Sequence, residues 1–230
     1  MALPLYLALT QAEFQNAEPL SGKIAWMACH FSPYGTGLCD LPSRLPKASA
    51  VILDDCIPVG RHDAKTVAGQ LAAQVEAVGA EAVLLDFQRE GCEAAQEIAK
   101  RIVDHLPCPV GVSERYAEGL NCPVFLPPIP PDMDWDGYFA PYKGREIWLE
   151  VSTQAETVVV TGNGATVCNG REHKADGFKD EELLCRYCME IAEDQAVFTL
   201  WRSEEDIQHM RERIGKFGVT RLFGLYQELG

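Results

Sequence analysis

Acidic side chains directly follow several apolar runs of the sequence, and these residues are the best suited to chemistry. They end or closely follow runs near residues 50–53, 82–85, 109–112, 147–151 and 221–226. A carboxylate can act as a general acid or base, or accept hydrogen bonds from hydroxyl groups. The candidate catalytic residues are therefore Asp54, Asp55, Asp86, Glu114, Glu150 and Glu228, with none of them singled out.

Amide, aromatic and imidazole side chains accompany these carboxylates. Side chains alternate along a strand, so Leu84, Asp86 and Gln88 should share one face. Amides and carboxylates beside an aromatic surface suit a small carbohydrate-like, polyhydroxyl ligand. The residues predicted to contact that ligand are Asp86, Gln88, Tyr226, Glu150, Trp148, His30 and Tyr34. For each aromatic residue taken alone, core packing is the favoured interpretation. His30 could instead act as a base, because its reference pKa is near neutrality.

Nine cysteines, an odd number, are scattered along the chain. This usage predicts reduced, mostly buried thiols in an intracellular, cytoplasmic protein. Cys185 and Cys188 form one close pair without a second pair to complete a zinc site, so packing is the favoured interpretation.

Other arrangements for a nucleophile or a metal are less favoured. A cysteine nucleophile is one such arrangement, because Cys29-His30 and Cys56 lie near strand ends. Cys29 and His30 are adjacent on a strand and should face opposite ways, so they should not form a catalytic pair. Asp54 and Asp55 with Asp86 could hold a divalent ion, but the spacing of a known calcium loop is absent. The sequence therefore predicts no metal and no cofactor.

Composition excludes several classes of function. The chain has 230 residues, of which 47% are hydrophobic and 23% charged, as in ordinary globular proteins. The net charge of −14 disfavours nucleic acid, anionic membrane surfaces and anionic ligands. The short apolar stretch at the N-terminus has no preceding basic residue, so it predicts neither a signal peptide nor a membrane span. Composition gives no oligomeric state.

Short apolar runs recur along the chain and are continuous rather than alternating, which is typical of parallel strands buried on both faces. They are residues 5–9, 24–29, 50–53, 82–85, 109–112, 123–126, 147–151, 197–201 and 221–226. Helical patterns are predicted at 63–78, 91–105 and 180–193, and a helix capped by Ser203 follows. Alternation of strands and helices favours an α/β fold.

Eight or nine such runs predict a single (β/α)8 TIM-type barrel over residues 1–230. The connections after the first, second, fifth and sixth runs are too short or irregular for full helices, so the barrel helices should be trimmed. Residues 157–167, around Gly162-Asn-Gly164, predict a β-hairpin insertion, and residues 127–142 predict a structured loop. An open doubly wound sheet is the alternative, but no glycine-rich phosphate loop follows a strand.

Residues 79–88 (GAEAVLLDFQ) carry a family resemblance. The segment resembles the fourth strand of family 18 glycoside hydrolases, the chitinase-like group, whose signature is D-x-x-D-x-D-x-E. The four signature positions fall on Glu81, Leu84, Asp86 and Gln88. The helix and strand ending at Tyr226 are also similar to the last pair of that group, in which an aromatic residue forms the floor of the sugar site. The resemblance implies a TIM barrel and a sugar ligand.

The departures from the signature bear on function. The family's acid is a glutamate that protonates the leaving oxygen, whereas Gln88 has no proton to transfer. Leu84 stands where the signature has its second aspartate, so that carboxylate is missing as well. Three hypotheses follow: a non-catalytic barrel that binds sugar, a hydrolase whose acid comes from another strand end, and a structural or partner-binding protein with a filled barrel mouth. In the third, the loop 127–131 and the hairpin 157–167 would be contact surfaces.

Overall fold

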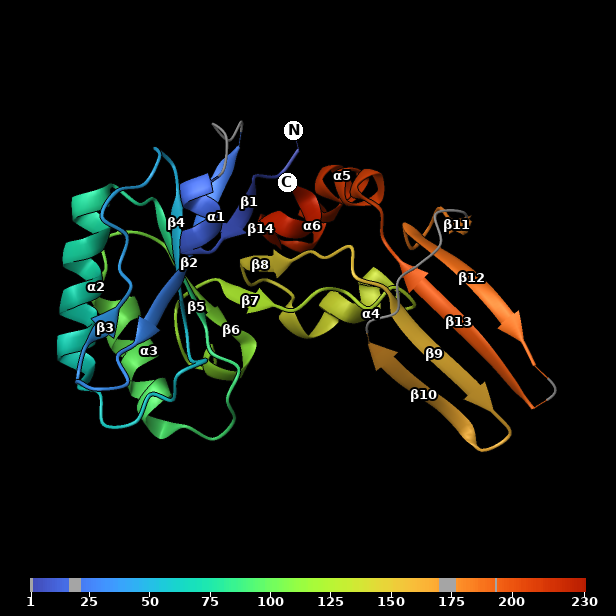
Figure 1. Cartoon of the computed structure of the whole chain (residues 1–230), viewed down its shortest axis with the longest axis horizontal. Helices are drawn as coiled ribbons and strands as arrows, with labels where there is room; N and C mark the ends of the chain where they lie inside the picture. The colour runs from blue at the N-terminus through green and yellow to red at the C-terminus, as the bar shows by residue number, and fades with distance from the viewer. Residues whose placement is uncertain (1, 17–21, 170–176, 193) are drawn as a thin grey trace.

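Eight parallel strands form a closed barrel in the computed structural model, which describes residues 2–16, 22–169, 177–192 and 194–230 (Figure 1). β1 pairs with β2 on one side and with β14 on the other, and this double pairing closes the ring. The barrel strands are β1 (Leu5–Leu9), β2 (Lys23–Phe31), β4 (Ala50–Asp54), β5 (Ala82–Asp86), β6 (Val110–Ser113), β7 (Val124–Leu126), β8 (Ile147–Glu150) and β14 (Val219–Leu225). The predicted TIM-type barrel is confirmed.

The helices between the strands are trimmed, as predicted. The longest are α2 (Ala64–Val78), α3 (Glu93–His105) and α5 (Glu204–Arg213). Asp63 caps the N-terminus of α2, where its carboxylate accepts the Thr66 N–H, and Gly79 caps the C-terminus in the left-handed conformation. Short pieces occupy the other connections: α1 (Gln11–Asn16), β3 (Leu38–Cys39), η1 (Glu114–Tyr116), α4 (Trp135–Phe139), η2 (Ala140–Tyr142), η3 (Ile214–Phe217) and α6 (Tyr226–Leu229). The predicted loop 127–142 contains α4 and η2.

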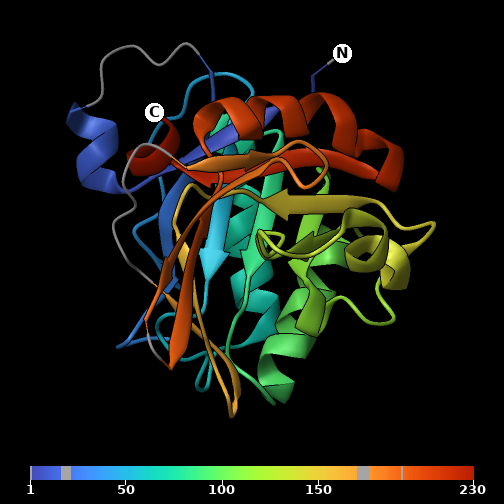
Figure 2. The ribbon, with the colours of Figure 1, turned by 90° about the vertical axis from the view of Figure 1, so that its right-hand side faces the viewer.

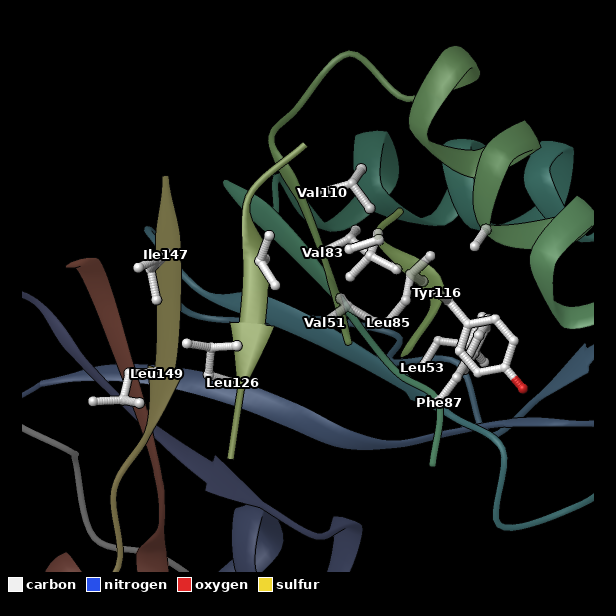
Figure 3. Packing of buried hydrophobic residues seen from close by; sticks show 14 of the residues in the cluster. Val51, Leu53, Val83, Leu85, Phe87, Val110, Tyr116, Leu126, Ile147 and Leu149 are labelled. Carbon is white, nitrogen blue, oxygen red and sulfur yellow. The ribbon is translucent and has the colours of Figure 1, made fainter. Parts of the chain in front are cut away.

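Each barrel strand buries both of its faces, which explains why the apolar runs are continuous. The outward-facing side chains, such as Leu53, Val83 and Leu85, pack beneath α2 and α3 (Figure 3). The inward-facing ones form a second cluster inside the barrel, made of Tyr6, Ala8, Ala25, Ala50, Ile52, Ala82, Leu84, Phe125, Trp148 and Phe223. The barrel interior is therefore a packed core.

A glycine on β6 makes room for the largest side chain of that interior. A Cβ atom at Gly111 would overlap the six-membered ring of Trp148, which is fully buried. The Trp148 ring also packs against Phe223, with 5.5 Å between ring centroids. The absence of a side chain at residue 111 is therefore required by the packing of the interior.

The insertion between β8 and α5 is larger than the predicted hairpin. It is a five-stranded antiparallel sheet that extends away from the barrel (Figures 1 and 2). Its strands are β9 (Glu156–Thr161), β10 (Gly164–Asn169), β11 (Phe178–Asp180), β12 (Cys185–Ile191) and β13 (Gln195–Trp201), in the order β10-β9-β13-β12-β11. β9 and β10 form the predicted hairpin, with Val158 opposite Val167.

Two predicted elements were wrong, and both lie in this sheet. Residues 180–193 were predicted to be a helix, but β12 occupies half of this segment and pairs with β11 and β13. Residues 197–201 were counted with the barrel strands, but β13 runs antiparallel between β9 and β12. β12 forms hairpins with its chain neighbours β11 and β13, and only β13 pairs with a distant strand, β9. Apolar spacing alone identified neither the hairpins nor the direction of β13.

Within the described ranges of the chain, the helices are too short or too polar for any of them to cross a bilayer.

Candidate functional site

Three carboxylates lie at the carboxyl ends of barrel strands and face a common cavity. Asp54 ends β4, Asp86 ends β5 and Glu150 ends β8. Each is two residues beyond an inward-facing core residue, so strand alternation turns all three toward the barrel axis. The cavity, called the mouth cavity below, has a volume of about 70 Å³. Its lining is Ala8, Met27, Ile52, Asp54, Leu84, Asp86, Phe125, Glu150, Phe223, Gly224 and Leu225.

The mouth cavity favours protonated carboxyl groups. Burial, reinforced by the charges of Asp86 and Glu228, raises the pKa of Glu150 to about 7. Burial also raises the pKa of Asp86, and the Asp54 and Asp55 charges act in the same direction. A hydrogen bond from the Gln88 side chain partly offsets this rise. Glu150 is therefore able to carry a transferable proton near neutral pH.

Leu84, Asp86 and Gln88 share one face of the chain, as predicted from strand alternation. Leu84 is buried in the barrel interior, Asp86 lines the mouth cavity, and the exposed Gln88 amide donates a hydrogen bond to the Asp86 carboxylate. Glu81, the first signature position, lies at the opposite end of the barrel, where it contacts Lys23 and the Tyr6 hydroxyl.

Asp55 and Glu114 lie outside the mouth cavity. Asp55 is 3% exposed, and its carboxylate accepts the backbone N–H groups of Gln88 and Arg89, both at 2.9 Å. It therefore ties the end of β4 to the loop after β5. Glu114 opens η1 and accepts a hydrogen bond from the Tyr142 hydroxyl.

Glu228 lies on α6 and binds the segment that follows β8. Its carboxylate accepts the Ser152 hydroxyl at 2.7 Å, the Thr153 N–H at 2.9 Å and the Gln154 side-chain amide at 2.8 Å. The structure thus brings Asp54, Asp86 and Glu150 to the mouth cavity, and uses the other three predicted carboxylates in loop contacts.

The three aromatic residues predicted to contact a ligand lie in three different environments. The Trp148 side chain is fully buried in the barrel interior, so its ring is not available to a ligand. Tyr34 is 98% exposed on the turn between β2 and β3. Tyr226 is half-buried at the start of α6, and it is not among the residues that line the mouth cavity.

His30, Asp54 and Cys56 form a polar cluster at the rim of the mouth. The His30 Nδ1 lies 3.0 Å from Asp54 Oδ1 and 3.4 Å from Cys56 Sγ. The Cys56 N–H donates to the same Asp54 oxygen at 3.0 Å. Partial burial and the neighbouring Asp54 raise the pKa of the Cys56 thiol to about 11. Cys29 faces the buried side of β2, as the alternation predicted.

A groove of about 390 Å³ lies beside the mouth, between the loop after β7 and the insertion. It is lined by Pro127, Pro128, Ile129, Pro130, Pro131, Ser152, Gln154, Ala155, Glu156 and Arg202. Arg202 is 5% exposed and donates hydrogen bonds to the carbonyl groups of Ile129, Pro130 and Leu183. It therefore fastens the proline-rich loop to the insertion. Sequence reasoning did not identify Arg202, because its partners are backbone atoms.

A larger cavity, of about 770 Å³, lies at the other end of the barrel. It is lined by residues that precede β8 and β14, including Arg145, Glu146 and Gly218. Ligands of parallel barrels meet the carboxyl ends of the strands, so the smaller mouth cavity is the better candidate site.

Sequence comparison matches the chain to no protein-family model and to no curated protein. Solved structures of low sequence identity share its fold. The spore cortex-lytic enzyme SleL from Bacillus cereus is 12% identical, with a TM-score of 0.60, over 99% of this chain and 71% of its own. A family 18 N-acetylglucosaminidase from Paenibacillus barengoltzii is 10% identical, with a TM-score of 0.60, over 98% of this chain and 95% of its own.

A third similar structure is a variant family 18 chitinase from Cycas revoluta in complex with (GlcNAc)4. It is 9% identical, with a TM-score of 0.58, over 97% of this chain and 94% of its own. The resemblance to family 18 glycoside hydrolases is thus confirmed for the fold.

Proposed function

We propose that the protein binds a carbohydrate or a similar polyhydroxyl ligand at the carboxyl-end mouth of its barrel. The observation that carries this proposal is the convergence of Asp54, Asp86 and Glu150 on one cavity. Carboxylates accept hydrogen bonds from hydroxyl groups, and the Gln88 amide beside Asp86 adds a donor and an acceptor. Gln88 stands where the family has its acid, so binding does not imply the family's reaction.

The volumes suggest how such a ligand would lie. The mouth cavity of about 70 Å³ has room for about two water molecules at ~30 Å³ each, which is too little for a sugar ring. A ring would lie over the mouth and direct one substituent into the cavity. The groove continues along the segment after β8, where Ser152 and Gln154 follow Glu150, and its volume of about 390 Å³ suits further rings.

The binding proposal is tested by titrating (GlcNAc)4 into the protein by calorimetry. Loss of the Asp86 carboxylate in Asp86→Ala should remove a charged hydrogen bond worth about 1.5–3 kcal/mol, a loss of affinity of roughly ten- to hundredfold. Glu97→Gln on the exposed face of α3 is the control and should bind as the native protein does. Equal affinity of Asp86→Ala and the native protein would refute a sugar site at the mouth, and no binding by either protein would favour a filled, partner-binding mouth.

A second candidate is a hydrolase with a relocated acid, and the pKa of Glu150 favours it. A carboxyl group with a pKa of about 7 can donate a proton at neutral pH, and Asp86 is a second carboxyl group in the same cavity. The native protein should then release the aryl group from an aryl N-acetylglucosaminide oligomer. Glu150→Gln should abolish that release while (GlcNAc)4 still binds. A native protein that binds but does not hydrolyse would eliminate this candidate.

A further inference from the structure

We propose that His30, Asp54 and Cys56 bind one divalent transition-metal ion of the zinc type at the rim of the mouth. The ligand atoms would be Nδ1 of His30, one carboxylate oxygen of Asp54 and Sγ of Cys56, which all lie within 4.8 Å of one another. This site shares Asp54 with the proposed carbohydrate site, whereas Asp86, Glu150 and Gln88 take no part in it, so the two sites can be tested separately.

The distances match a tetrahedral zinc site. Zinc bonds of about 2.0 Å to nitrogen and oxygen and about 2.3 Å to sulfur imply edges of about 3.3 Å between nitrogen and oxygen and about 3.5 Å between nitrogen and sulfur. The corresponding separations here are 3.0 Å from His30 to Asp54 and 3.4 Å from His30 to Cys56. An ion could therefore enter with shifts of a few tenths of an ångström along these two edges.

The backbone positions these side chains before any ion binds. β2 and β4 are neighbouring parallel strands, and His30 is the register partner of Asp54. The Cys56 N–H donates to Asp54 at 3.0 Å, and this contact turns the chain so that the sulfur returns to His30. Cys56 is exposed, so rotation of its side chain can close the remaining edge between sulfur and oxygen.

The chemistry of the three ligands selects the ion. A thiolate and an imidazole are soft or borderline ligands that favour Zn²⁺, Co²⁺ or Cu²⁺ over Mg²⁺ or Ca²⁺. One thiolate and one carboxylate carry two negative charges, which equal the charge of the ion. Three protein ligands leave a fourth position for water, as in catalytic zinc sites.

The same geometry argues against a cysteine nucleophile activated by His30. A nucleophile and an orienting carboxylate normally use different nitrogens of the imidazole, so that the ring can relay a proton. Here both Asp54 and Cys56 contact Nδ1. Upon metal binding the thiol proton goes to solvent. The proton that His30 Nδ1 directs at Asp54 is also released, and the ring takes one up on Nε2 from solvent, so that the Nδ1 lone pair can bind the ion. No oxidant or reductant is needed.

The test is a titration of chelator-treated full-length protein with Zn²⁺ and with Co²⁺. The native protein should bind one equivalent, and Co²⁺ should give the thiolate-to-cobalt absorption band. Cys56→Ser should lose that band and bind Zn²⁺ at least about 100-fold more weakly, since even outer contacts of a metal site cost 10- to 100-fold. Cys168→Ser removes an exposed cysteine on β10 and should leave both results unchanged.

Two outcomes would overturn the site. One is native protein without stoichiometric Zn²⁺ binding, and the other is Cys56→Ser that binds as tightly as native protein. His30→Gln, with far-ultraviolet circular dichroism matching the native spectrum, checks the nitrogen ligand in a second variant. Asp86→Ala should retain full zinc binding, so a failed metal site and a failed carbohydrate site give different results.

Discussion

Replacing Glu150 with glutamine should stabilise the protein in alkali and leave its stability unchanged in acid. Glutamine has nearly the same shape but carries no charge. The carboxyl group is buried beside Asp86, and its pKa is about 7 instead of 4.5. The folded state therefore binds the Glu150 proton more tightly than the unfolded state does, which fixes the sign of the effect.

The magnitude follows from the two pKa values. Below pH 4.5 the group is protonated in both states and contributes nothing. As the pH rises to about 7, ionisation becomes costlier in the folded state, at about 1.4 kcal/mol for each pH unit. The loss of stability amounts to roughly 3 kcal/mol and is complete above pH 7. Glu150→Gln avoids this loss.

Urea unfolding followed by tryptophan fluorescence between pH 4.5 and 8 measures the effect. The free energy of unfolding of Glu150→Gln minus that of the native protein should grow from near zero to roughly 3 kcal/mol. Glu97→Gln, on the exposed face of α3, should show no such growth. A difference that stays constant with pH, or a less stable Glu150→Gln at pH 8, would refute the burial and charge repulsion described for the mouth cavity.

Three further predictions concern the interior, a helix cap and the signature. Gly111→Ala should lower the free energy of unfolding, measured in urea, by up to about 3 kcal/mol, because its Cβ overlaps Trp148. Gly69→Ala is the control: residue 69 lies in the middle of α2 on its exposed face, and the change should raise the free energy of unfolding by about 1 kcal/mol. Ser203→Ala should cost about 1 kcal/mol through loss of the α5 capping box, seen as a lower melting temperature. Gln88→Glu should give no strong hydrolysis of a fluorogenic chitin oligosaccharide, since the middle carboxylate of the signature is also missing; robust turnover would contradict this.

The barrel could be predicted from sequence because its pattern is local. A parallel strand covered on both faces is a continuous apolar run, and all eight barrel strands contain one. The cap residues Asp63 and Ser203 also act on neighbouring atoms, so their helices began where predicted. The insertion was less predictable: the apolar spacing of residues 180–193 also fits an amphipathic helix, although β12 forms hairpins with β11 and β13.

Only those features of the site that follow from strand alternation could be predicted from the sequence. Alternation placed Asp86 and Gln88 on one face, and it did so correctly. It did not reveal that Asp55 binds two backbone N–H groups of the next loop. Nor did it bring Cys56 to His30, because that contact depends on the register of β2 and β4 and on the turn that follows β4.

The way the five-stranded sheet is joined to the barrel has a consequence for how this protein can change. Glu156 and Leu200 are direct partners across β9 and β13, with Cα atoms about 5 Å apart for such a pair. The polypeptide thus leaves and rejoins the barrel at neighbouring positions, and none of the strands described between them pairs with a barrel strand. A different module could be exchanged at that junction, or a short turn substituted for it, while the eight-stranded scaffold keeps its connectivity. The wall beside the mouth can therefore diversify separately from the strands that hold the carboxylates, provided that a replacement covers the core where Leu184 packs and pairs with Asp206 as Arg186 does.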